Sequence, residues 1–167
     1  MPSATSVLVQ TPAQAVAAAA ASPSATTSAA SSTSSSSGPT LTTYKNTTTP
    51  GPAGSALCLS EGGPNGSAAL YWCFQGASQK WLYDATAGSL KGNSSGNCLA
   101  ASSPAAGSAV ISKTCDSSDA NQKWNWTGSG FGLKGSGNCM DSTALSNGAT
   151  MALNPCSGGA SQTYVQS

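Results

Sequence analysis

The sequence predicts an all-β domain built from three repeats of about 41 residues, preceded by a low-complexity segment. Two independent markers carry this period. A Gln residue is followed two positions later by an aromatic residue at 79–81, 122–124 and 162–164, in steps of 43 and 40 residues. The cysteines recur in step with them, as the pairs Cys58 and Cys73, Cys98 and Cys115, and Cys139 and Cys156. A period shared by independent markers indicates internal repetition rather than chance.

The chain before residue 40 differs in composition from the rest. No charged residue occurs from Met1 to Tyr44, and residues 31–37 read SSTSSSS. Such a segment has almost nothing to bury, so the entropy cost of ordering it, roughly 1 to 2 kcal/mol per residue, is not offset. We therefore expect residues 1–39 to form a disordered Ser/Thr/Ala-rich segment. Two interpretations stay open, an O-glycosylated stalk or linker and an inert tail.

Residues 40–167 are expected to form the ordered domain, with repeats at about 40–87, 88–128 and 129–167. All four Trp and all six Cys lie in this part. The second and third repeats match in the order of turn, Cys, apolar residue, variable loop, strand, Cys, polar loop and Gln-x-aromatic triplet, and the first repeat has a shorter middle. Six Cys allow many disulfide pairings in principle. The repeat selects the pairing in which each unit closes its own loop.

Within the second repeat we predict four short strands, near residues 89–92, 98–101, 109–113 and 122–126. Gly, Asn, Ser and Pro separate them. Trp124 and Trp126 lie two positions apart and therefore share a face of their strand. Three such repeats give twelve strands, which is too few for a usual propeller, while an open stack would leave edge strands exposed. A barrel with threefold symmetry and a cap of hairpins fits the strand count best.

The composition indicates an oxidising compartment. Six Cys occur without any His and without a Cys-x-x-Cys pair, which favours disulfides over a metal site or a redox motif. Four Asn-x-Ser/Thr sequons agree with a secretory route. They begin at Asn46, Asn65, Asn93 and Asn125. No signal peptide is evident, so we expect a piece of a longer secreted or cell-surface protein, with a poorly recognised leader as the alternative.

The low charge argues against several functions. Only 7% of the residues are charged and the net charge is +1, so no basic surface for nucleic acid is expected. No apolar run is long enough to insert into a membrane. The five acidic residues come without a His base, and we expect no catalysis, no cofactor and no metal. Asp116 and Asp119, which are close in sequence, are interpreted as turn formers.

The Gln-x-Trp triplet, the Cys-Leu or Cys-Met strand and the period of about forty residues resemble the ricin-type β-trefoil lectins. The resemblance covers residues 40–167. It implies that the aromatic residues of the triplets point inward and close the core, and that the Gln side chains tie neighbouring loops by hydrogen bonds. The residues with these structural roles are Gln79, Trp81, Gln122, Trp124, Gln162 and Tyr164.

The resemblance also implies carbohydrate binding. Sugar sites of this family use a carboxylate just after the Cys-Leu pair, an aromatic residue two positions before the second Cys, and polar residues around the triplet. A carboxylate accepts hydrogen bonds from neighbouring sugar hydroxyls, and an aromatic face packs against the C–H side of a pyranose ring. No repeat of this chain carries the complete set.

The three repeats keep different parts of that set. The first keeps an aromatic residue, Tyr71, and the third keeps a carboxylate, Asp141, for which a turn or solubility role is the other interpretation. The second has Ala100 and Lys113 at these positions and is expected to be structural. One of Tyr71 and Trp72 should face the core, because successive strand residues point in opposite directions. The candidate carbohydrate-binding residues are Ser60, Tyr71, Gln79, Asp141, Asn154 and Gln162.

We therefore predict a secreted carbohydrate-binding module with partly degenerate sites, accessory to a larger extracellular protein or enzyme, whose partners are glycans or polysaccharide. A shallow site of this kind binds in the millimolar class, about −4 kcal/mol. Useful avidity then requires a second site, an oligomer or an attached enzyme. The alternative is a trefoil that binds a protein instead, such as an inhibitor or an adhesion module.

Overall fold

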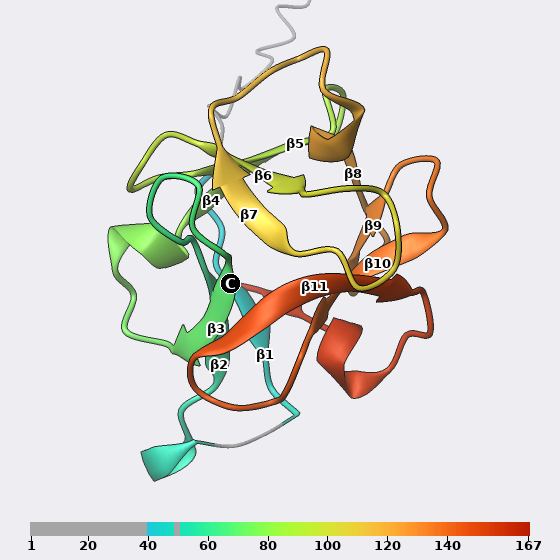
Figure 1. Ribbon diagram of the computed structural model, residues 1–167. Helices are drawn as coiled ribbons and strands as arrows, with labels where there is room; N and C mark the ends of the chain where they lie inside the picture. Colours follow the sequence, from blue (N-terminus) through green and yellow to red (C-terminus); the bar gives the residue numbers. More distant parts are fainter. Residues whose placement is uncertain (1–39, 49–50) are drawn as a thin grey trace, which may run out of the picture. The chain divides into compact units, whose positions relative to one another are not determined.

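The computed structural model describes residues 40–48 and 51–167, and the expected low-complexity segment 1–39 lies outside the described residues. The described residues form twelve short β-strands and four single 3-10 turns (Figure 1). The strands are β1 (Tyr44–Asn46), β2 (Leu57–Ser60), β3 (Ala69–Trp72), β4 (Trp81–Asp84), β5 (Ser89–Gly92), β6 (Cys98–Ala101), β7 (Val110–Lys113), β8 (Trp124–Trp126), β9 (Phe131–Leu133), β10 (Asn138–Ser142), β11 (Ala149–Pro155) and β12 (Val165–Gln166). The 3-10 turns are η1 (Pro52–Gly54), η2 (Ala77–Gln79), η3 (Ala120–Gln122) and η4 (Ala160–Gln162).

The strand pairing repeats three times along the chain. The two middle strands of each group of four form an antiparallel hairpin, namely β2–β3, β6–β7 and β10–β11. The first strand of each group pairs with its own hairpin, and the fourth pairs with the first strand of the next group, as in β4–β5 and β8–β9. Strand β12 returns to pair with β1. The domain is therefore closed with threefold repetition, as the strand count predicts.

The three hairpins also join one another by backbone pairing. Strands β3 and β11 pair directly, and isolated bridges connect the other hairpins. The contacts are Leu70–Ala149, Ala69–Thr150, Ser67–Ile111 and Ala109–Ala152. The predicted strand at 109–113 begins one residue later than expected, at Val110, because Ala109 forms only an isolated bridge to the third repeat.

The aromatic residues of the three triplets are buried, which confirms that they point inward. Trp81 and Trp124 are fully inaccessible to solvent, and Tyr164 is 1% exposed. Each indole N–H donates to the backbone carbonyl of the residue after the first Cys of its repeat, at 2.9 Å in both cases. Burial raises the pKa of the Tyr164 hydroxyl well above its usual value. These rings meet buried aliphatic side chains from all three repeats, so the core belongs to the whole domain.

A second group of aromatic rings packs against this core. Tyr44 and Tyr83 both meet the ring of Phe131 edge-on, with centroids 4.8 and 5.4 Å away, and Trp126 lies 4.9 Å from the same ring. The Tyr83 hydroxyl donates to the Trp124 carbonyl at 3.2 Å and accepts the Trp126 N–H at 3.0 Å. This hydroxyl therefore connects β4 of one repeat to β8 of the next. Edge-to-face pairs of this kind add roughly 0.5 to 1.5 kcal/mol beyond their buried area.

The disulfides follow the predicted pairing. Cys58 bonds to Cys73, Cys98 to Cys115, and Cys139 to Cys156, so each repeat closes a loop of its own. The sequence separations are 15, 17 and 17 residues. Loops of this size are worth roughly 3 kcal/mol each in the chain-entropy model. Each bond holds the start of a hairpin strand against the end of its partner strand.

The triplet Gln does not begin a strand, contrary to the prediction for residues 122–126. Gln122 ends η3, and β8 begins at Trp124. The cause is a local turn, in which the Asp119 carboxylate accepts the Asn121 N–H at 2.9 Å and the Gln122 N–H bonds to the Asp119 carbonyl at 3.1 Å. Turns η2 and η4 occupy the same place before β4 and β12. A 3-10 turn at the triplet is therefore a constant feature of the repeat.

Replacement of Trp124 by Ala should lower the free energy of unfolding by about 3 to 5 kcal/mol, because it leaves a cavity and removes a buried indole hydrogen bond. Denaturation by guanidinium chloride under oxidising conditions measures the change. Phe74→Ala is the matched control, since Phe74 is 61% exposed and its loss should change stability by no more than about 0.5 kcal/mol. Equal effects of the two substitutions would contradict the inward role of Trp124.

Candidate functional site

The candidate binding positions occupy equivalent places in the three hairpins. The carboxylate position lies on the first strand of each hairpin, and the aromatic position lies on the second strand. The residue that pairs with the carboxylate position comes two positions before the aromatic position in the sequence. The two candidate positions are therefore diagonal neighbours on one face of the sheet, within reach of long side chains. The pairs are Ser60 with Tyr71, Ala100 with Lys113, and Asp141 with Asn154. The fold brings these predicted residues together in every repeat.

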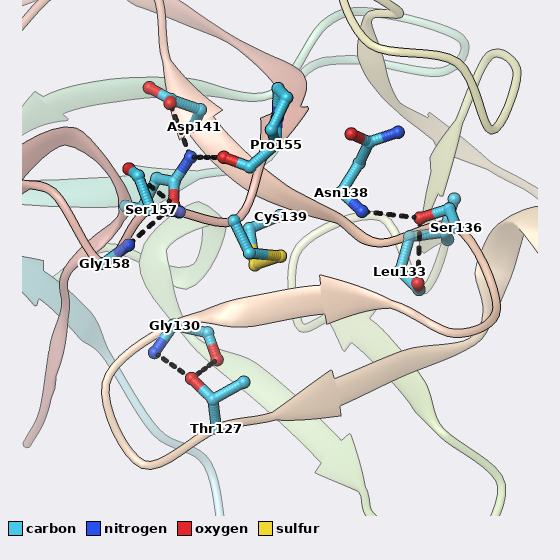
Figure 2. The surroundings of a disulfide bond; sticks show 12 residues. Thr127, Gly130, Leu133, Ser136, Asn138, Cys139, Asp141, Pro155, Ser157 and Gly158 are labelled. Carbon is cyan, nitrogen blue, oxygen red and sulfur yellow. Dashed lines mark hydrogen bonds between the residues drawn. A yellow bond between two sulfur atoms is a disulfide. The ribbon is translucent and has the colours of Figure 1, made fainter.

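Beside each pair, the triplet Gln is a buried hydrogen-bonding centre. In the third repeat the Gln162 amide donates to the Pro155 carbonyl at 3.0 Å and accepts the N–H groups of Ser157 and Gly158 at 2.8 and 3.2 Å (Figure 2). The other two repeats make the same contacts on both sides of their second Cys. Gln79 bonds to Trp72 and Phe74, and Gln122 bonds to Thr114 and Asp116. The predicted role of the Gln residues in tying loops together is confirmed.

The Gln amide also reaches a third acceptor, and this acceptor differs between repeats. Gln79 donates to the Ser60 hydroxyl at 3.0 Å, and Gln162 donates to the Asp141 carboxylate at 2.8 Å. In the second repeat Ala100 has no acceptor to offer, and the carboxylate of Asp119 lies 3.4 Å from the Gln122 amide instead. The carboxylate position therefore supports the Gln as well as facing the candidate site.

In the first repeat, only one of the predicted residues is open to solvent. Ser60 and Gln79 are buried and bonded to each other, whereas Tyr71 is 44% exposed. Trp72, the next residue of β3, packs against the core. The alternation predicted for these neighbouring aromatic residues is confirmed, and Tyr71 is the one that offers a ring face to a ligand.

A hollow of about 270 Å³ lies beside Tyr71. Besides Ser60 and Tyr71, its lining includes three residues that the sequence did not single out, Glu61, Phe74 and Ser78. The Phe74 ring is 61% exposed and lies close over Gly76, where a side chain would collide with it. The sequence signal that could have identified Phe74 is an aromatic residue next to a Cys in a polar loop. The first repeat thus presents two rings and a carboxylate around one hollow.

The Glu61 carboxylate is held by the next repeat. It accepts the backbone N–H groups of Ser94 and Ser95 at 2.7 and 3.2 Å, together with the Ser95 hydroxyl at 2.5 Å. Gly92 allows this approach, because a Cβ at that position would lie 2.4 Å from the carboxylate. The edge of the hollow is therefore fixed by a contact between repeats, which no pattern within one repeat reveals.

The second repeat closes its site with an ion pair. The Lys113 ammonium, at the aromatic position, lies 3.1 Å from the Asp119 carboxylate. Asp119 also caps η3, and the Asn121 N–H, followed by Lys113, holds the pKa of this carboxyl below its usual value. Asp116 accepts the N–H and hydroxyl of Ser118. Both acids stabilise turns, as predicted, and the two candidate positions of this repeat, Ala100 and Lys113, offer neither an aromatic face nor a carboxylate.

In the third repeat, Asp141 lies inside β10 and is 9% exposed, so the turn or solubility interpretation is wrong for this residue. One of its oxygens accepts the Gln162 amide (Figure 2). Among the described residues, no hydrogen bond reaches the other carboxylate oxygen or the Asn154 side chain. The pair therefore presents a carboxylate oxygen and an amide on one face of the hairpin.

The largest hollow of this repeat lies elsewhere. It measures about 450 Å³ and is bordered by the Cys139–Cys156 disulfide and by strands β8 and β9, shown in Figure 2 with the Thr127–Gly130 turn. Gln162 contributes to its lining, but Asp141 and Asn154 do not. This hollow and the predicted binding pair are therefore different places on the domain.

Two further features bear on function. Within the part of the chain that the structure describes, no three His, Cys, Asp or Glu side chains gather closely enough to hold a metal ion. In the same residues, no helix combines the length and apolar composition needed to cross a membrane.

Comparison with known proteins gives one matching family. The sequence matches the ricin-type beta-trefoil lectin domain over residues 27–164. No curated protein matches the chain.

Solved structures with the same fold include a designed protein and two natural lectins. ThreeFoil, designed with threefold symmetry, has a TM-score of 0.62 and 22% identity, covering 75% of this chain and 96% of that one. The agglutinin from Abrus precatorius has a TM-score of 0.62 and 22% identity over 77% of this chain, which spans only 46% of the agglutinin chain. The C-half of the earthworm R-type lectin, solved in complex with GalNAc, has a TM-score of 0.59 and 16% identity, covering 76% and 98%. The predicted β-trefoil fold is confirmed.

The ion pair of the second repeat predicts a pH-dependent loss of stability. Asp119→Ala should lower the free energy of unfolding by about 1 kcal/mol at neutral pH, because it removes a turn cap and a partly exposed ion pair. Since the folded-state pKa of Asp119 is lowered, this stabilisation is present above the unfolded-state pKa of about 3.9. It is lost as the pH falls through the lower folded-state value.

Chemical denaturation of wild type and variant at neutral and strongly acidic pH measures this difference. The two proteins should differ at neutral pH and converge in acid. Lys113→Ala, which removes the ion pair and leaves the cap, should cost less at neutral pH. A difference between wild type and Asp119→Ala that persists undiminished in acid would contradict the role assigned to the carboxylate.

Proposed function

The chain belongs to the ricin-type β-trefoil lectin domain family, and from this premise we propose that it is a secreted carbohydrate-binding module with one site in the first repeat and one in the third. Family membership and the lectins among its structural neighbours support carbohydrate binding in general. The three disulfides support an oxidising, extracellular location.

The observation that carries the proposal is the first-repeat hollow beside Tyr71. An exposed phenol ring, a second ring at Phe74 and a fixed carboxylate at Glu61 surround a space of about 270 Å³. A sugar offers apolar C–H groups on one face and hydroxyls at its edge, so it can pack on a ring while it donates hydrogen bonds to a carboxylate. Ser60 and Gln79 hold the hairpin and the loop in place behind the hollow.

The third-repeat site rests on hydrogen bonding rather than stacking. Asp141 offers a carboxylate oxygen that a sugar hydroxyl can reach, with Asn154 beside it and Gln162 fixing the orientation of the carboxylate. Because the buried hydrogen bond from Gln162 already holds the Asp141 carboxylate, ligand binding does not have to pay the entropy of ordering this side chain. Without a ring face, this site should be the weaker of the two.

Both sites are shallow, so useful binding requires more than one contact. Single-site affinities in the millimolar class correspond to about −4 kcal/mol. Two sites on one domain, or attachment of the domain to an enzyme that acts on the same polysaccharide, raise the effective concentration of the second contact. We propose the accessory role in a larger extracellular protein on this ground.

Tyr71→Ala should weaken sugar binding at the first repeat about tenfold, equivalent to about 1.4 kcal/mol, because it removes the stacking face. Asp141→Asn should weaken the third-repeat site similarly, while the Asn side chain still accepts the Gln162 hydrogen bond and preserves the fold. A screen of the full oxidised chain against oligosaccharides and polysaccharides identifies a ligand. Titration of that ligand followed by NMR at millimolar concentration then gives the affinity of each variant.

Lys113→Ala is the matched control, since Lys113 occupies the position of Tyr71 in the second repeat and should leave sugar binding unchanged. Loss of binding in a folded Tyr71→Ala or Asp141→Asn variant would locate the site in its repeat. No binding of any saccharide by the folded wild type would overturn the proposal and favour a trefoil that binds a protein.

A further inference from the structure

We infer that Asn65, Asn93 and Asn125 carry N-linked glycans, whereas the fourth sequon, at Asn46, is closed by the fold. The inference rests on the secretory route proposed above, and it does not depend on whether the domain binds sugar. The sequence offers four equivalent Asn-x-Ser/Thr patterns. The structure separates them by the state of one atom, the side-chain Nδ2 to which the glycan is attached.

The chemistry sets the requirement. N-glycosylation joins Nδ2 of the Asn to the anomeric carbon of a lipid-linked oligosaccharide. The bond between that carbon and the lipid pyrophosphate breaks, the pyrophosphate leaves with the electron pair, and Nδ2 loses one proton. The product keeps a single N–H on Nδ2 and has a pyranose ring directly beside it. A site compatible with the folded domain therefore needs an Nδ2 with a proton to spare and open space around it.

Asn46 meets neither condition. It is completely buried in β1, and its Nδ2 donates to the carbonyls of Ala160 and Thr163 at 2.6 and 3.0 Å. Its Oδ1 accepts the Thr48 N–H at 3.0 Å. A glycan would remove one of the two donated bonds and place a sugar ring where η4 packs. The lost hydrogen bond and the steric conflict both oppose a glycan at this position.

Asn125 meets both conditions. Its side chain is exposed on β8 and borders the hollow of about 450 Å³ beside the Cys139–Cys156 disulfide. Within the described residues, its amide makes no hydrogen bond. Gly132, which pairs with Cys139 and has no side chain, also lines this hollow. The first sugar on Asn125 therefore has room beside the strand.

Asn93 and Asn65 are equally open. Asn93 is exposed and borders a hollow of about 270 Å³, and only its backbone N–H is engaged, with the Lys80 carbonyl at 2.9 Å. Asn65 is exposed in the turn after β2, at a backbone φ of 59°, a conformation that Asn tolerates better than most residues. The side-chain amides of both residues make no hydrogen bond to any described residue.

The test is secretion of the full chain from a eukaryotic host, followed by removal of N-glycans with peptide-N-glycosidase in H₂¹⁸O. This treatment converts each formerly glycosylated Asn to ¹⁸O-labelled Asp, which peptide mass spectrometry locates. We expect the label at Asn65, Asn93 and Asn125, and none at Asn46. Label at Asn46 in the folded, disulfide-bonded protein, or its absence from any of the other three, would overturn the assignment.

Variants give an independent readout by electrophoresis. Asn65→Gln, Asn93→Gln and Asn125→Gln should each remove one glycan from the secreted protein. Thr48→Ala is the matched control, because it destroys the sequon at Asn46 and keeps the buried amide and the Thr48 N–H. It should change neither the glycan number nor the secreted yield. A smaller glycan number in Thr48→Ala would also count against the assignment.

Discussion

The buried amide of the triplet Gln is the interaction on which the three repeats depend. In each repeat one Gln side chain bonds to backbone groups on both sides of the second Cys, so it fixes the end of the hairpin relative to the 3-10 turn. The aromatic residue two positions later then enters the core at a fixed angle, and the disulfide closes beside it. A buried amide is stable only when its donors and acceptor are satisfied. The same geometry must therefore recur three times, although the surfaces above it differ.

The third hydrogen bond of this amide has a different acceptor in each repeat. This difference explains why the surface of each repeat is different. A hydroxyl at Ser60, a carboxylate at Asp141 and a carboxylate borrowed from Asp119 all accept from Gln. Because backbone groups hold the rest of the amide, the strand residue can change without loss of the fold. The second repeat differs most, with Ala100 on the strand and the Lys113–Asp119 ion pair at the equivalent place. The surface side chains of one repeat can thus differ while the shared scaffold stays the same.

Features that repeat within the chain were predictable from the sequence, and features that depend on contacts between repeats were not. The period and the disulfide pairing follow from spacing, the burial of Trp81 and Trp124 follows from the family resemblance, and strand alternation requires that one of Tyr71 and Trp72 faces outward without saying which. Glu61 could not be singled out, since its partners Ser94 and Ser95 lie in the next repeat. The strand expected at Gln122 failed because the backbone turns before the triplet in all three repeats, where the Gln N–H donates to the carbonyl three residues earlier. Hydrophobic alternation does not register such a turn, which Asp119 caps with its side chain in the second repeat alone.

Threefold repetition also makes the differences between repeats informative. Equivalent positions in the three repeats have the same local backbone geometry. A difference between their side chains can therefore be interpreted almost without reference to the backbone. Lys91 and Gly132 pair with equivalent cysteines, and a hollow lies beside the disulfide in both repeats, about 340 Å³ with Lys91 in its lining and about 450 Å³ with Gly132 and Asn125 in its lining. The same comparison places a ring at Tyr71, an ammonium at Lys113 and an amide at Asn154 on identical strand positions. Every unit contributes buried side chains to one core, so the repeat is strict there, whereas the exposed side chains at equivalent positions differ from unit to unit.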